Sequence, residues 1–272
     1  MNWLRNISYF SLLLLIAPVL LLLYEGFGPL RNPLGYGGAV FRSIELTLLS
    51  SALAALVEVL LFTPLAYYLA RNRNSVAESL TDIPAVIPHP IVGVALLLLA
   101  SPLTPFGSFL LSIGLNLFNS LLGLVVALVI VSAPIYVKSM QPFFESMNLA
   151  HENFALGLGA SRMRTFISVV MPSSFRGVVG ATLIAMSRAM SEFGSIAILA
   201  YYVLQSPFYG VNPAPVLIFD YYSYYGLNVA VTASAVMILV SIALMILLRV
   251  VRNPSSAKLF RTNQFRRLEP RR

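Results

Sequence analysis

The chain has 272 residues, of which 58% are hydrophobic and only 10% are charged, and its formal net charge is +8. Ordinary soluble domains carry about 25% charged residues, so this composition excludes a water-soluble globular protein and indicates an integral membrane protein. The chain has no cysteine, which excludes disulfides, thiolate metal sites and cysteine nucleophiles.

Six long apolar runs follow one another along the chain. Each reaches or nearly reaches the ~20 residues that a helix needs to cross the hydrocarbon core, and each is too continuous for the alternating pattern of a membrane barrel. No small-x-small cleavage site follows the first run, so we expect an uncleaved span rather than a secretory signal. The sequence predicts an all-α integral membrane protein with six transmembrane helices, at residues 7–24, 43–69, 83–99, 120–137, 175–204 and 227–248.

The basic residues are distributed unevenly between the connections. Most of the 18 Lys and Arg residues fall on one side if the amino terminus is cytoplasmic, and the positive-inside rule then places both termini in the cytoplasm. We expect a transmembrane domain over 1–252, a basic cytoplasmic tail over 253–272 that either lies near anionic headgroups or serves only to retain the topology, and a multi-pass location in the plasma membrane. Because topology accounts for the positive charge, we expect membrane lipid and not nucleic acid as a partner.

The connection at 138–173 is the longest on the cytoplasmic side. Loops longer than ~12 to 15 residues are usually functional or disordered. This one mixes large apolar residues with charges every few positions, so it cannot span the membrane and is too apolar to be idle in water. We expect an amphipathic helix near residues 149–158 that lies on the membrane or on a protein partner, with Gly159 able to end it.

The stretch from Glu152 to Pro172 resembles the cytoplasmic EAA loop of ABC importer permeases. Gly159 and Pro172 have that motif's thirteen-residue spacing, and Ala155 matches its second alanine. Asn153 stands where the family has its glutamate, and Glu152 lies one position earlier. The resemblance implies a segment that couples to an ABC ATPase subunit through Glu152, Asn153, Ala155, Gly159 and Pro172, with a helix near residues 149–158 that continues through Pro172 into the fifth span.

The resemblance extends to two further motifs. A proline-rich start of the third run, residues 83–97, is similar to that of molybdate, tungstate and sulfate permeases, and Ser187-Arg-Ala-Met-Ser-Glu-Phe-Gly-Ser195 is similar to their Arg-Ala-x-x-Glu-Phe-Gly motif. The resemblance implies the type I ABC importer permease fold, a homodimer of this chain, and an extracellular oxyanion-binding protein that delivers the substrate. The Pro88-His89-Pro90 form favours tungstate or molybdate, and sulfate or another anion is the alternative.

Several polar residues lie within the apolar runs. Arg188 and Glu192 are four residues apart, and a charge at the bilayer centre costs roughly 2.5 to 3.5 kcal/mol, so both should face protein or water. Either they line an anion pathway or they form an internal ion pair, and Gly194 beside them suits close helix packing. We expect Glu58 to bond a neighbouring helix. His89 has no partners at ligand spacing, so we expect a satisfied polar residue and no metal site.

No Gly-x4-Gly-Lys-Ser/Thr phosphate loop is present in the sequence. We therefore expect a chain that is not an enzyme and needs no cofactor, with ATP hydrolysed on a separate subunit. An ion-coupled secondary transporter is the alternative of a different class, but it predicts inverted repeats, which the sequence does not show clearly. A membrane enzyme would need a nucleophile and base pair that the apolar runs do not offer.

Overall fold

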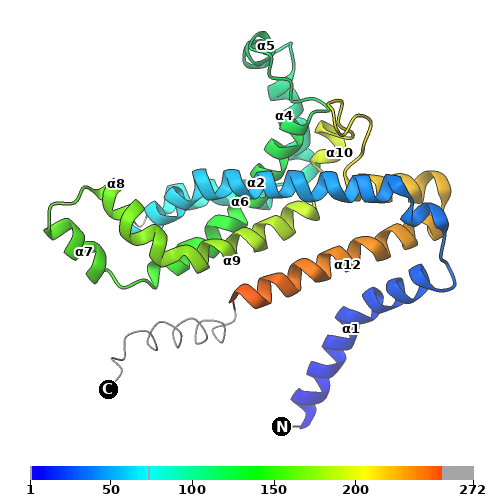
Figure 1. Cartoon of the computed structure of the whole chain (residues 1–272), viewed down its shortest axis with the longest axis horizontal. Coiled ribbons are helices and arrows are strands. Elements are labelled where there is room, and N and C mark those ends of the chain that lie inside the picture. Colours follow the sequence, from blue (N-terminus) through cyan, green and yellow to red (C-terminus); the bar gives the residue numbers. More distant parts are fainter. Residues whose placement is uncertain (1, 73, 253–272) are drawn as a thin grey trace, which may run out of the picture. The chain divides into compact units, whose positions relative to one another are not determined.

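The computed structural model describes residues 2–72 and 74–252, and within these residues it is helical, with no strand beyond isolated bridges at Val203 (Figure 1). Five helices in this part of the chain are long and apolar enough to cross a membrane, and the pair α3 and α4 makes a sixth if it counts as one broken span. This agrees with the expected multi-pass helical protein. The expected basic tail, 253–272, lies outside the described residues.

The principal helices are α1 (Asn2–Phe27), α2 (Gly38–Arg71), α3 (Ser75–Val86), α4 (His89–Ala100), α5 (Pro105–Ser112), α6 (Leu121–Glu145), α9 (Met171–Met190), α11 (Ala214–Asp220) and α12 (Leu227–Arg252). The chain forms two compact units, the first from Met1–Ser51, Pro88–Leu128 and Met190–Ala243, and the second from Ala52–Ile87, Val129–Ala189 and Leu244–Arg272.

In the first unit, the carboxyl-terminal end of α1 contacts α12. The apolar window of α1 has no buried residue, as expected for a helix that is apolar on all faces and meets lipid. At its carboxyl end, a side chain on Gly26 would lie 2.6 Å from Ala235 Cβ, so the two helices are in close contact there. A small core of Val40, Ile44, Ala214 and Ala233 joins α2, α11 and α12.

The second unit is built on the carboxyl-terminal half of α2, on α6 and on α9. Its core includes Leu69, Tyr136, Met140 and Val170, all nearly or fully buried. The hydroxyls of Thr63 and Tyr136 bond across the core at 2.6 Å. This unit holds all of the connection in which the sequence predicts the coupling segment.

Polar contacts attach α3 to α6 within the second unit. Lys138 Nζ lies 3.0 Å from Asp82 Oδ1, and Gln141 Nε2 donates to Glu78 Oε1 at 2.9 Å. The third apolar run therefore begins in α3, whose polar residues contact α6. Residues 83–86 of that run belong to α3.

Two of the expected spans differ from the helices observed. The third run, 83–99, is interrupted because α3 ends at Val86 and α4 begins at His89; Pro88 at the break has no backbone N–H to continue a helix. The fifth run, 175–204, is not one helix either, because α9 ends at Met190 and its helical run already begins at Arg162.

Candidate functional site

The connection at 138–173 is ordered as a series of short helices. Helix α6 extends beyond the expected span to Glu145, and α7 (Ala150–Gly157), α8 (Arg162–Thr165) and the π-helical turn η2 (Phe166–Val170) follow. Asn148 opens α7 by accepting a hydrogen bond from Ala150 N at 2.9 Å, the arrangement of an Asx turn. A helix is thus present where the sequence predicts one, near residues 149–158.

Helix α7 is unusual in what it buries. Every residue of this helix is described, and Glu152 is the one residue that is buried. Its large apolar side chains point the other way: Phe154 is 71% exposed and Leu158, at the carboxyl-terminal cap, is 74% exposed. Asn153 is exposed and Ala155 is half-buried. The helix therefore contacts its own chain through a carboxylate and leaves its apolar residues uncovered.

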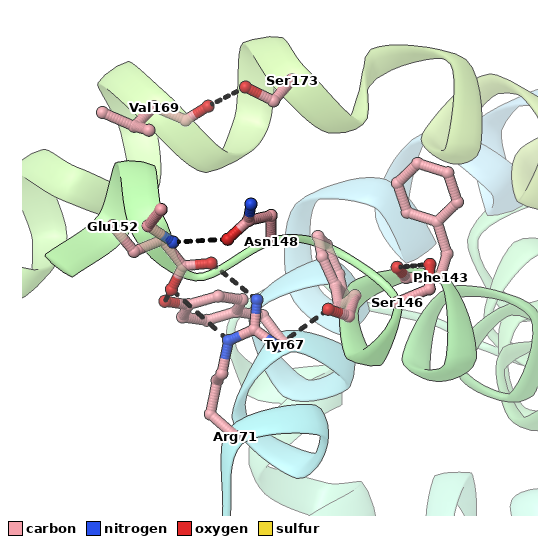
Figure 2. A network of polar contacts seen from close by, with 10 residues as sticks. Tyr67, Arg71, Phe143, Ser146, Asn148, Glu152, Val169 and Ser173 are labelled. Atoms are coloured by element: carbon pink, nitrogen blue, oxygen red, sulfur yellow. Dashed lines mark hydrogen bonds and ion pairs between the residues drawn. The ribbon is translucent and has the colours of Figure 1, made fainter. Parts of the chain in front are cut away.

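The Glu152 carboxylate is held by two side chains from the end of α2 (Figure 2). Arg71 Nη2 lies 2.6 Å from Oε1, Arg71 Nε lies 3.4 Å from Oε2, and the Tyr67 hydroxyl donates to Oε2 at 2.6 Å. The two charged side chains are only 17% and 8% exposed. We call Tyr67, Arg71 and Glu152 the α2–α7 clamp.

The clamp is supported from further elements of the same unit. Arg71 Nη1 donates to the carbonyl of Phe144 at 2.7 Å, in the last turn of α6, where helix carbonyls lack intrahelical partners. The Arg71 guanidinium lies 5.3 Å from the centre of the Tyr67 ring, a cation–π distance. The Tyr67 ring in turn packs on Phe144 and Phe166, with centroids 5.5 and 5.0 Å away. Two elements besides α7, the end of α6 and the η2 turn, thus hold the two α2 side chains in place.

The electrostatics of the clamp favour the ionised carboxylate. Burial alone would raise the pKa of Glu152, but hydrogen bonds from Arg71 and Tyr67 and the Arg71 charge outweigh it and lower the pKa. Glu152 also lies in the first turn of α7, where the helix dipole favours a negative charge. The clamp is therefore a charged pair at neutral pH.

Gly159 ends α7 in a Schellman motif. Its φ is +83°, in the left-handed region that favours glycine, its N–H donates to Leu156 O at 2.9 Å, and Ala160 N donates to Ala155 O at 3.1 Å. These are the two bonds that define the motif. The glycine of the sequence motif is thus required by the backbone, and the chain turns there before α8 begins.

This turn corrects one expectation about the coupling segment. The resemblance suggested a helix continuous from α7 through Pro172 into the fifth span, yet the continuous helical run starts only at Arg162, after the Gly159 turn. Pro172 lies in the first turn of α9, directly after the π-helical turn η2. A proline lacks the N–H for the usual i to i−4 bond, and a local π-type turn accommodates that loss.

A hollow opens beside α7. Its volume is about 230 Å3. The residues around it come from the loop before α7, from α7 itself and from the η2–α9 run: Met147, Asn148, His151, Glu152, Val169, Val170 and Ser173. Because of this hollow, α7 is not closely packed on the helical run that follows it.

The second predicted site lies in the first unit, where the chain leaves α9. Glu192 is fully buried and lies 2.7 Å from His89 Nδ1, and its other oxygen accepts from Ser195 N and Oγ at 2.8 and 2.9 Å. A side chain on Gly194 would lie 2.8 Å from Pro90 Cδ, so this segment packs tightly on the start of α4. His89 is a satisfied polar residue, as expected.

The two charged residues of the fifth run do not share a helix. Arg188 is half-buried in the last turn of α9, whereas Glu192 follows the end of that helix at Met190. Their four-residue spacing therefore does not place them on one helical face.

Glu58 bonds a neighbouring helix, as expected, since the Ser132 hydroxyl of α6 donates to its buried carboxylate.

No motif in the sequence singles out Tyr67 and Arg71. Arg71 counts there only among the basic residues that the positive-inside rule assigns to the cytoplasmic side. A signal was nevertheless present, because the two residues are four apart at the end of an apolar run and so lie on one helical face.

Comparisons with known proteins agree with a helical membrane protein. Residues 62–255 match the family described as binding-protein-dependent transport system inner membrane component. The molybdate/tungstate transport system permease protein WtpB of Thermococcus kodakarensis is 32% identical over 77% of this chain and 78% of its own length. The sulfate transport system permease protein CysT of Synechocystis sp. is 28% identical over 92% of this chain and 87% of its own.

A solved structure has the same fold. A chain from the inward-facing conformations of the MetNI methionine ABC transporter covers 79% of this chain and 95% of its own, with a TM-score of 0.52 and 18% identity. The expected ABC importer permease fold is confirmed. Together with its apolar helices, the inner-membrane family makes the chain a multi-pass protein of the plasma membrane.

Proposed function

Since the chain belongs to the family of binding-protein-dependent transport system inner membrane components, we propose that it is the membrane-spanning subunit of an ATP-driven importer and that a separate ATPase subunit docks on α7. The observation that carries this proposal is the outward apolar side of α7. Exposed apolar residues rimmed by polar ones mark interaction sites, and Phe154 and Leu158 are such residues on a helix whose buried group is a carboxylate.

The geometry of the helix explains how both apolar residues come to face outward. At 3.6 residues per turn, Phe154 and Leu158 lie about 200° and 240° around the helix from Glu152. Holding the carboxylate against α2 therefore turns both side chains away from the chain's own surface. Met163 on α8 is exposed as well.

The substrate that we propose is molybdate or tungstate, with sulfate as the alternative. Support comes from the relatives, which are permeases of molybdate/tungstate and of sulfate systems, and from the proline-rich start of α4. We propose that Arg188, half-buried in α9, attracts the anion, and that the tight packing of Glu192 and Gly194 on α4 positions the segment after α9.

The proposed assembly contains two copies of this chain, two ATPase subunits and an extracellular binding protein for the oxyanion. Both termini and α7 lie on the cytoplasmic side in this proposal. ATP-driven closure of the ATPase subunits displaces α7, and the helices of the permease convert that displacement into alternating access. Covalent chemistry belongs to the ATPase, and this chain does conformational work.

Reconstitution with the ATPase subunit and the binding protein tests the proposal. We expect the ATPase to copurify with this chain, and its ATP hydrolysis to be stimulated by binding protein loaded with molybdate or tungstate more than with sulfate. Uptake that depends on an ion gradient and continues without ATP would refute the proposal in favour of a secondary transporter.

A matched pair of substitutions tests the docking surface. Phe154→Ser removes an exposed phenylalanine from α7, and Phe175→Ser removes one of similar exposure from α9. We expect only Phe154→Ser to weaken retention of the ATPase, because buried aromatic residues carry much of the energy of an interface. Equal retention by both variants would contradict docking at α7.

A further inference from the structure

The attachment of α7 to its own unit is polar. The helix has eight residues, and Glu152 is its buried one. Isolated helices shorter than ~12 residues are marginal in water and depend on tertiary contacts. With a hollow of about 230 Å3 beside it and its large apolar residues exposed, α7 depends for its position on the clamp and on its two covalent connections.

The two covalent connections of α7 can bend more easily than the clamp. The carboxyl-terminal connection passes through the left-handed turn at Gly159, and the amino-terminal one is the short loop that follows Glu145. Neither is a continuous helix, so each can bend when α7 is displaced. The clamp is a direct link to α2, through an arginine fork that is itself bonded to the end of α6.

Clamp geometry suits the transmission of movement. A planar guanidinium that meets a carboxylate with two nitrogens is directional, and both partners are largely shielded from water. The Tyr67 hydroxyl adds a third bond to the same carboxylate, and its ring is held by Phe144 and Phe166. A displacement of Glu152 therefore pulls on α2 and on the end of α6 together.

We propose that Tyr67 and Arg71 are positioning residues that hold Glu152 and transmit the movement of α7 to α2, a second route beside the helical run that leads into α9. The inference rests on the proposed function, because it assumes that an ATPase moves α7. It also assigns Glu152 a role within the permease, since a carboxylate occupied by Arg71 and Tyr67 is not presented to the ATPase. The ATPase contacts the exposed apolar residues instead.

The first experiment removes one bond from the clamp in the reconstituted complex. Tyr67→Phe deletes only the hydroxyl, and Tyr68→Phe deletes the hydroxyl of its exposed neighbour on α2 as the matched control. A hydrogen bond to a charged group is among the stronger ones in a protein, so hydrogen exchange of the α7 amides should become roughly tenfold faster or more in Tyr67→Phe. We expect unchanged exchange in α9, and no change anywhere in Tyr68→Phe.

The second experiment separates the positive charge of Arg71 from the fork of its guanidinium. Arg71→Lys keeps the positive charge but not the fork, and Arg71→Gln removes the charge. We expect the amount of anion imported per ATP hydrolysed to fall several-fold in Arg71→Gln and to be partly restored in Arg71→Lys, with the ATPase still bound in both. A purely structural role would reduce assembly and hydrolysis together and leave that ratio unchanged.

The outcomes separate this inference from the proposed function. If the ATPase copurifies with every variant and the ratio of import to hydrolysis stays at the wild-type value in Arg71→Gln, the clamp does not transmit movement, while docking at α7 stands. If the ATPase does not bind even the unaltered chain, the proposed function itself fails. Slower or unchanged α7 exchange in Tyr67→Phe would overturn the clamp as the attachment of α7.

Discussion

The Schellman turn at the end of α7 allows a prediction from two neighbouring glycines. Gly157 lies within the helix and Gly159 lies two residues later in the left-handed turn, and an added Cβ meets nothing within 4 Å at either position. Gly157→Ala and Gly159→Ala therefore add the same methyl group to open space. Any difference between them comes from the backbone alone.

The expected effects have opposite signs. Alanine in place of a helical glycine stabilises the helix by roughly 0.5 to 1 kcal/mol, so Gly157→Ala should make α7 firmer. The left-handed conformation costs an L-residue roughly 1 to 2 kcal/mol, so Gly159→Ala should loosen the turn. Since 1.4 kcal/mol is a factor of ten, the two variants should differ by roughly tenfold to a hundredfold in the local opening equilibrium of α7.

Hydrogen exchange of the α7 amides in the complete complex measures that equilibrium. We expect exchange to slow in Gly157→Ala and to accelerate in Gly159→Ala, with ATP hydrolysis less well coupled to import in the second variant. Gly159→Trp should couple worst, because it adds bulk on the side where the ATPase docks. Equal exchange in the two alanine variants would refute the assignment of Gly159 as the residue that ends the helix.

Three further predictions concern charge and packing. The hydrogen bonds that Glu152 accepts outweigh its burial and hold its pKa below the ordinary 4.5, so its contribution is complete above that pH and is lost as the pH falls through the lowered pKa. The protection of the α7 amides, that is, their exchange relative to the intrinsic rate at the same pH, should therefore fall in acid, and Glu152→Gln should remove this dependence. Arg188→Gln should reduce anion import more than Arg188→Lys does, and equal import by both would contradict attraction by charge. Gly194→Ala should cost about 1 to 3 kcal/mol of stability, measured as a lower melting temperature, because the new methyl meets Pro90 at 2.8 Å, whereas Gly38→Ala meets nothing within 4 Å and should be silent.

Hydropathy predicted the order of the membrane helices, and their number to within the broken pair α3 and α4, because the bilayer sets a length that the sequence must supply. It did not predict where the helices end. The helix of the fifth run ends at Met190, although apolar residues continue, because Glu192 bonds Ser195 N and Gly194 packs on Pro90. Such endings depend on contacts with a distant helix, and a window of local hydropathy contains no information about them.

The candidate site was predictable to a similar degree. Glycine at 159 could be recognised from its spacing, and the structure supplies the physical reason, a left-handed turn closed by two backbone bonds. The partners of Glu152 could not be recognised, since Tyr67 and Arg71 precede it by more than eighty residues. The positive-inside rule is enough to explain a basic residue such as Arg71 at the end of a span. Only the fold shows that Arg71 also forms an ion pair with Glu152.

The use of a carboxylate to hold α7 has a consequence for specificity of docking. An apolar face pressed on the chain would tolerate several rotations of so short a helix, because apolar contacts have no fixed direction. A carboxylate that accepts from Arg71 and Tyr67 accepts in one orientation, which fixes the rotation of α7 about its own axis. Phe154 and Leu158 are then presented at defined positions although both are exposed. Loss of the clamp should therefore misdirect the docking surface as well as loosen it, and a Phe154→Ser substitution should weaken ATPase retention less in an Arg71→Gln background than in the unaltered chain.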